Sequence, residues 1–177
     1  MIQLKNHGID GKLWEWIDSW LTRRKQRVVL NGVKSDWENV LSGVPQGSVL
    51  GPLLFLVFVN IIEEGLHNRV LKFADDVKLI GVSMKDTYIQ SIQDDLDKLV
   101  KWSNDWQMAF NYEKCKVMHI GRINDNFNYH MEGHPLDKIY EEKDLGVIVT
   151  NDLKSERQCE AASKKAFKML GIINRKV

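Results

Sequence analysis

The stretch VLKFADDVKLI, residues 70–80, decides which fold we expect for this chain. Two short apolar runs flank the tight connection Ala74-Asp75-Asp76, which predicts an antiparallel hairpin. Two carboxylates a few ångströms apart repel each other by roughly 4 kcal/mol at an effective dielectric near 20. Either one of them takes up a proton or a cation lies between them, and Mg²⁺ typically binds one or two carboxylates together with substrate phosphates. A solvated turn is the more common explanation of these residues alone, because aspartate is frequent in turns.

A loop rich in glycine and proline, SGVPQGSVLGP at residues 42–52, lies upstream of the acidic hairpin. Its glycines allow the backbone to approach a ligand closely, and Gln46 and Ser48 supply polar groups. Alone, the loop is equally consistent with an ordinary entry into the apolar segment 53–62. We expect a buried helix there, with Pro52 in its first turn.

The segments around these two motifs alternate between helix and strand signals. Asp10 is a candidate N-cap for a helix whose expected buried face comprises Leu13, Trp16, Ile17, Trp20 and Leu21. Asn31-Gly32 favours a two-residue hairpin turn. The longest helix signal covers residues 86–110. Strands are expected at residues 116–120 and 146–149, and a final amphipathic helix follows. This order indicates an α+β fold with a split βαβ-like antiparallel sheet packed on helices.

The segment 86–110 has one apolar stripe and one charged face. The stripe comprises Ile89, Ile92, Leu96, Leu99, Ser103 and Trp106. The charged residues expected to face away from it, toward solvent, are Asp94, Asp95, Lys98 and Lys101.

The composition limits the class of protein. The chain has 177 residues, a net charge of +1 and two cysteines. It is therefore expected to be an ordinary globular domain, not one held to nucleic acid by bulk charge, and two cysteines favour a reducing compartment. The opening lacks a signal peptide, and the apolar stretch 49–62 is shorter than the roughly 20 residues of a membrane span. We expect an intracellular protein of nucleus or cytoplasm, neither secreted nor membrane-bound.

The ordered motifs resemble one family. GVPQGSVLGPLLF followed by FADD is similar to the reverse transcriptases of non-LTR (LINE-type) retrotransposons, particularly jockey-like elements. Further matching segments are GIDGKLWEWIDSWLTRRKQRVVLNG, LDKLVKWSNDWQMAFNYEKCKVMHIG and EEKDLGVIV. The resemblance implies a right-hand polymerase palm over residues 1–150 and the start of a helical thumb at 151–177. It also implies RNA-templated addition of deoxynucleotides to a primer 3′ hydroxyl with two Mg²⁺ ions, or Mn²⁺ in their place. The implied partners are an RNA template, a DNA primer and deoxynucleoside triphosphates.

The resemblance also implies roles for individual residues. Asp75 and Asp76 would be the catalytic metal ligands of motif C. Lys114 in motif D would assist protonation of the leaving pyrophosphate. Leu145 and Gly146 would belong to the hairpin that grips the primer end. The expected substrate-binding residues are Pro45, Gln46, Gly47, Ser48, Phe73 and Ala74.

In this family another metal-binding aspartate, in motif A, lies just upstream of the segment with which this sequence begins. We therefore expect the 177 residues alone to be inactive or feeble as a polymerase. An exposed sheet edge beside the acidic hairpin would favour self-association. The alternative is a non-catalytic palm domain, domesticated or from a pseudogene, that binds nucleic acid or a protein partner. A metal-dependent nuclease has no supporting motif.

Two further patterns carry weaker signals. The basic run at residues 23–27 would contact phosphates or form a solvated helix end. A zinc site is disfavoured, because residues four apart on a strand are separated by roughly 13 Å. The residues of that pattern are Cys115, His119, His130 and His134.

Overall fold

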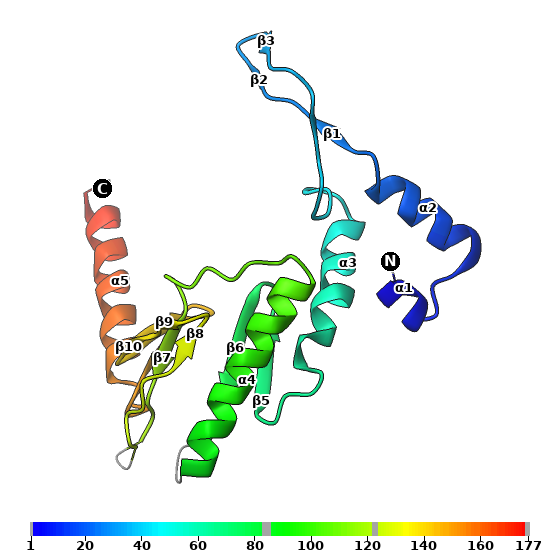
Figure 1. Cartoon of the computed structure of the whole chain (residues 1–177). Coiled ribbons are helices and arrows are strands. Elements are labelled where there is room, and N and C mark those ends of the chain that lie inside the picture. Colours follow the sequence, from blue (N-terminus) through cyan, green and yellow to red (C-terminus); the bar gives the residue numbers. More distant parts are fainter. Residues whose placement is uncertain (1, 83–85, 122–123, 176–177) are drawn as a thin grey trace. The chain divides into compact units, whose positions relative to one another are not determined.

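The computed structural model describes residues 2–82, 86–121 and 124–175 (Figure 1). The chain divides into two compact units, which are treated separately below. Unit 1 comprises Met1–Gly65 and Val70–Lys78, and unit 2 comprises Leu66–Arg69 and Leu79–Val177. None of the described helices is long and apolar enough to span a bilayer.

The helices of unit 1 surround a small apolar core. They are α1 (Ile2–Asn6), α2 (Gly11–Leu21), α3 (Leu50–Val59) and the 3₁₀ helix η1 (Asn60–Glu63). The core centres on Leu4, Ile17 and Leu54, one from each of the three α-helices. A buried residue from each helix means that no single helix of this unit can bury its apolar face without the others.

Helix α2 confirms the predicted helix but not all of its predicted buried face. Asp10 occupies the N-cap position in an extended conformation, although its side chain makes no capping hydrogen bond. Leu13 and Trp16, predicted to be buried, are more than half exposed. The buried side is instead rotated toward Trp14, which packs against the core and lies beneath the ammonium group of Lys5.

A long two-part hairpin, here called the arm (residues 25–39), follows α2. Strand β1 (Lys25–Gln26) pairs antiparallel with β4 (Glu38–Asn39), and β2 (Val29–Leu30) pairs with β3 (Val33–Lys34). Asn31 and Gly32 have φ angles of 50° and 83°, as the predicted type I′ turn requires. Every residue of the arm is exposed.

The predicted acidic hairpin is confirmed. It consists of β5 (Arg69–Phe73) and β6 (Asp76–Ile80), which form a two-stranded sheet. The upstream helix is confirmed in part. α3 begins at Leu50 with Pro52 in its first turn, but Leu53 and Leu56 are more than half exposed, so the helix is not buried on all sides as expected.

Unit 2 contains the long helix α4 (Asp86–Asp105), which ends before the predicted residue 110. Ile89, Leu96 and Leu99 are buried, as the stripe predicts. The prediction that Asp95 faces solvent is wrong, because its side chain is 0% exposed. Its carboxylate is buried because it accepts hydrogen bonds from the backbone N–H groups of His67 and Asn68.

Short strand pairs and a final helix complete unit 2. The strands are β7 (Lys116–Met118), β8 (His130–Met131), β9 (His134–Pro135), β10 (Asp137–Ile139), β11 (Glu141–Asp144) and β12 (Val147–Thr150). β7 pairs with β10 in parallel, whereas β8–β9 and β11–β12 are antiparallel. Across the described residues the strands form six two-stranded sheets, so the chain is a mixed α+β protein as predicted.

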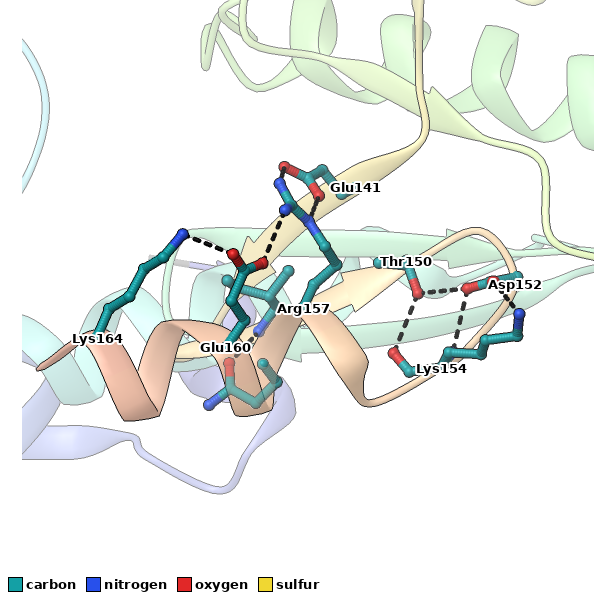
Figure 2. A network of polar contacts seen from close by, with 9 residues as sticks. Glu141, Thr150, Asp152, Lys154, Arg157, Glu160 and Lys164 are labelled. Carbon is teal, nitrogen blue, oxygen red and sulfur yellow. Dashed lines mark hydrogen bonds and ion pairs between the residues drawn. The ribbon is translucent and has the colours of Figure 1, made fainter. Parts of the chain in front are cut away.

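Helix α5 (Glu156–Asn174) is attached to the β11–β12 hairpin by polar contacts (Figure 2). The Arg157 guanidinium donates to both carboxylate oxygens of Glu141, at 2.9 and 3.2 Å. This interaction lowers the pKa of Glu141 below its ordinary value. The Gln158 side-chain oxygen accepts from the Ile148 N–H at 2.9 Å. None of the described residues of α5 is buried, so these contacts, not an apolar core, hold its first turn.

Candidate active site

The two candidate carboxylates lie at the turn between β5 and β6. Asp75 is a central residue of the two-residue turn, and Asp76 is the first residue of β6; both side chains are exposed. Ala74, the other central residue, has a φ of 53°, whereas Asp75 has a negative φ. A positive φ is a conformation that glycine adopts freely and that alanine rarely adopts. Placing alanine in this left-handed region costs roughly 1–2 kcal/mol. Seven other described non-glycine residues also have a positive φ, so this strain alone does not mark the turn as a functional site.

Lys72 fixes the hairpin to the end of α3. Its ammonium group donates to the backbone oxygen and to the side-chain oxygen of Asn60, each at 3.1 Å, and forms an ion pair with Glu63 at 3.1 Å. The Lys72 side chain is only 18% exposed. Beside it lies a hollow of about 260 Å³, lined by Lys72 and Ala74 together with His7, Asn60 and residues of α3. A lysine within the apolar run at residues 70–73 is the signal in the sequence that points to this anchor.

The glycine-rich loop before α3 is closed by a side chain of its own. The Ser48 hydroxyl donates to the Pro45 carbonyl at 2.7 Å and accepts from the Gly51 N–H at 3.0 Å. Gln46 and Gly47 form the exposed turn between them, with Gly47 at a φ of 77°. The predicted role of Ser48 as a substrate contact stays a prediction, and the structure adds an anchoring role for its hydroxyl.

Gly51 makes this closure sterically feasible. A Cβ atom at this position would lie 2.8 Å from the Pro45 carbonyl oxygen and 2.8 Å from the Ser48 hydroxyl oxygen. Both distances are far below van der Waals contact, so any other residue would displace the loop from the start of α3.

The other predicted site residues belong to unit 2. Lys114 is exposed at the end of a turn in which its N–H donates to the Asn111 carbonyl at 3.0 Å. Leu145 and Gly146, with φ angles of 47° and 90°, form the turn that joins β11 and β12. Unit 1 thus contains the predicted metal ligands and all six predicted substrate-binding residues, whereas Lys114 and the primer-grip turn lie in unit 2.

Metal-ligating side chains do not gather into a larger cluster within the described part of the chain. No group of three or more His, Cys, Asp or Glu side chains there is arranged to hold an ion. At the β5–β6 turn the residues available to bind a metal ion are the two adjacent carboxylates of Asp75 and Asp76. Two carboxylates suit Mg²⁺, which completes its octahedral coordination with waters and phosphate oxygens.

Comparison with known proteins gives a consistent picture. Residues 1–174 match the family model for reverse transcriptase (RNA-dependent DNA polymerase). The chain is 33% identical over 159 residues to the RNA-directed DNA polymerase from mobile element jockey of Drosophila funebris, covering 82% of this chain and 17% of that protein. It is 31% identical over 115 residues to the Drosophila melanogaster jockey polymerase, covering 59% and 12%.

A third relative is the probable RNA-directed DNA polymerase from transposon X-element of Drosophila melanogaster. It is 32% identical over 104 residues, which cover 55% of this chain and 12% of that protein. The chain spans less than a fifth of the length of each of these relatives. No solved structure gives a significant match.

Proposed function

The chain belongs to the reverse transcriptase (RNA-dependent DNA polymerase) family, and on that premise we propose that it is part of an RNA-directed DNA polymerase. The reaction would add deoxynucleotides to a primer 3′ hydroxyl on an RNA template. The observation that carries this proposal is the exposed acidic pair at the β5–β6 turn, which lies downstream of the glycine-rich loop in the same unit.

We propose that Asp75 and Asp76 hold Mg²⁺, or Mn²⁺ in its place. When bound, such ions neutralise phosphate charge and activate the attacking hydroxyl. The chain's own contribution is positional. Lys72 ties β5 to Asn60 and Glu63, so the two carboxylates follow directly after a strand that is fixed at its side. Exposed carboxylates on a rigid element can meet a triphosphate without prior rearrangement.

The remaining roles follow the family pattern. Gln46 and Gly47 would line the pocket where the template base meets the incoming nucleotide, which agrees with their exposure at a loop tip. Lys114 would protonate the leaving pyrophosphate, and the turn at Leu145-Gly146 would hold the primer end. In this proposal residues 1–150 form a polymerase palm and residues 151–177 begin a thumb.

Two carboxylates from one turn are few for a site that has to fix two ions. We propose that a third carboxylate joins Asp75 and Asp76, from motif A of the family. Primer extension is then expected to require a chain that carries this motif as well as the 177 residues described here.

Primer extension on an RNA template tests the proposal. The 177-residue chain and a longer chain that includes motif A of a jockey-type polymerase would be compared with Mg²⁺ and with Mn²⁺. Asp75→Asn is the diagnostic variant. Asp36→Asn, which removes an exposed carboxylate from the arm of the same unit, is the matched control. Circular dichroism establishes that each variant is folded.

Extension by the longer chain that is lost with Asp75→Asn and kept with Asp36→Asn is the expected result. Full activity of Asp75→Asn would overturn the role of the acidic pair. Extension by the 177 residues alone would overturn the need for a third carboxylate. Binding of nucleic acid by both chains without any extension would instead support the non-catalytic alternative.

A further inference from the structure

The side chain of Arg24 reaches from the end of α2 to the glycine-rich loop. Its Nε donates to the Leu21 carbonyl at 2.7 Å. Its Nη2 donates to the Ser42 carbonyl at 3.3 Å and to the Gly43 carbonyl. Arg24 is half-buried, whereas Arg23 and Lys25 on either side of it are exposed. One residue of the basic run at 23–27 is thus directed at backbone carbonyls within the unit.

The backbone of Arg24 also lies at the root of the arm. Its carbonyl accepts the Val40 N–H at 2.9 Å, one step beyond the last β1–β4 pair, Lys25 with Asn39. The position of Arg24 is therefore set by the end of α2 on one side and by the arm on the other. Because the backbone of Arg24 is fixed in this way and its guanidinium group is planar and rigid, the side chain can hold the carbonyls that it binds in one geometry.

Arg24 and Ser48 together restrain the loop at both ends. Arg24 binds the carbonyls of Ser42 and Gly43 at the upstream end. Ser48 closes the downstream end onto Pro45. Between these two anchors only Gln46 and Gly47 form a fully exposed turn. A loop that is ordered before its ligand arrives loses less conformational entropy on binding.

We propose that Arg24 is a positioning residue for the glycine-rich loop and thereby sets the affinity of the site for the incoming nucleotide. This inference rests on the proposed function, since it assigns Gln46 and Gly47 to the nucleotide pocket. Arg24 acts through the loop backbone and not by contact with phosphate. Losing the anchor frees the loop without altering the acidic pair.

Amide hydrogen exchange of the 177-residue chain tests the anchor independently of activity. Arg24→Gln is expected to speed exchange of the Gly51 N–H, which the Ser48 hydroxyl protects, by about tenfold, because both hydrogen bonds from Arg24 to the loop are lost. Arg24→Lys should fall between Gln and wild type, because a lysine cannot bridge the helix end and the loop with a planar fork. Arg23→Gln is the matched control. It removes the same charge from the exposed side chain that precedes Arg24, and loop exchange should stay unchanged.

Steady-state kinetics with an extension-competent chain test the consequence for the nucleotide. Arg24→Gln should raise the KM for deoxynucleotide several-fold while kcat falls little. A merely structural role would lower the folded fraction, which reduces the apparent kcat and leaves KM unchanged.

The two measurements separate the possible failures. Unchanged loop exchange in Arg24→Gln, or a fall in kcat at constant KM, would overturn the positioning role. A third outcome is that Arg24→Gln speeds loop exchange while the longer chain with wild-type Arg24 extends no primer. That result would uphold the anchor and refute the polymerase proposal.

Discussion

Asp95→Asn is the substitution with the largest effect expected on stability. The Asp95 carboxylate is 0% exposed and serves as the acceptor for several donors. The backbone N–H groups of His67 and Asn68 approach it at 2.9 and 2.8 Å, and the Asn68 side-chain amide at 2.9 Å. Lys98 completes the set at 3.1 Å. An asparagine replaces one of the two acceptor oxygens with an NH₂ donor that faces other donors.

The magnitude follows from what the substitution leaves behind. A buried backbone N–H without an acceptor costs about 1–3 kcal/mol. The Lys98 side chain is 38% exposed, so solvent screens the ion pair and its loss adds little to this cost. Because Asn turns one acceptor oxygen into a donor that faces other donors, we take the upper end of the cost of unpaired groups, about 3 kcal/mol in the free energy of unfolding. Proteins of ordinary stability have only about 5–15 kcal/mol in total.

Urea unfolding measures this loss. With an m-value of about 2 kcal/mol/M, a loss of about 3 kcal/mol lowers the midpoint by about 1.5 M. Asp94→Asn is the matched control, because Asp94 is exposed and accepts the Gln90 side-chain amide one turn earlier on α4. Its midpoint should stay near that of wild type. A midpoint for Asp95→Asn within about 0.3 M of wild type would refute the reasoning.

The pH dependence gives a second readout of Asp95. Burial alone would raise the pKa of its carboxyl, but the hydrogen bonds from His67, Asn68 and Lys98 outweigh burial and hold the pKa below its ordinary value of 3.8. A lowered folded-state pKa stabilises the fold at pH values above the unfolded pKa, and this contribution is lost as pH falls through the folded pKa. The difference in stability between wild type and Asp95→Asn should therefore shrink as the pH drops below about 4.

Two further substitutions test other polar contacts. Lys72→Met removes the anchor of β5 on Asn60, so we expect the Mg²⁺ concentration for half-maximal primer extension to rise several-fold; an unchanged titration curve would show that the anchor does not position the acidic pair. Arg157→Gln breaks the exposed contact with Glu141, so thermal unfolding should show a small loss of stability at low salt that disappears at high salt. A loss that persists at high salt would contradict an electrostatic origin.

The features that the sequence predicted well are those set by neighbouring residues. Asn31-Gly32 forms the expected turn because both residues tolerate positive φ. Pro52 lies in the first turn of α3, where a missing N–H costs nothing. The acidic pair lies at a hairpin turn because two apolar runs fix the strands on either side of it. None of these outcomes depends on a distant part of the chain.

The features that the sequence did not predict depend on partners far along the chain. Asp95 lies on the charged face of α4 by periodicity, and its burial depends on His67, 28 residues upstream. Arg24 looks like one more residue of a basic helix end, and its acceptor Gly43 is 19 residues downstream. A prediction from helical periodicity assigns charged side chains to the solvent-exposed face. A charged side chain can nevertheless be buried when fixed hydrogen-bond donors or acceptors surround it.

The strain at Ala74 is a related case. The sequence predicted a short connection that included Asp76. In the structure Asp76 begins β6, so the turn has only two central residues, and Ala74 has a positive φ. Alanine has no local preference for a positive φ, so this conformation could not be deduced from the sequence.

The anchors in unit 1 share one property that bears on how the site works. Arg24, Ser48 and Lys72 each bind a backbone carbonyl, at Gly43, Pro45 and Asn60 respectively. A backbone carbonyl is present whatever side chain its residue carries. Arg24 and Lys72 therefore fix the path of the chain without using a side chain predicted to contact the ligand, whereas Ser48 is both an anchor and a predicted substrate contact. Gln46 and Asp75 are exposed, and the segments that carry them are restrained by these hydrogen bonds to the backbone. Substitutions at the anchors should therefore change how well a ligand is positioned, whereas substitutions at the exposed residues should change which ligand chemistry is accepted.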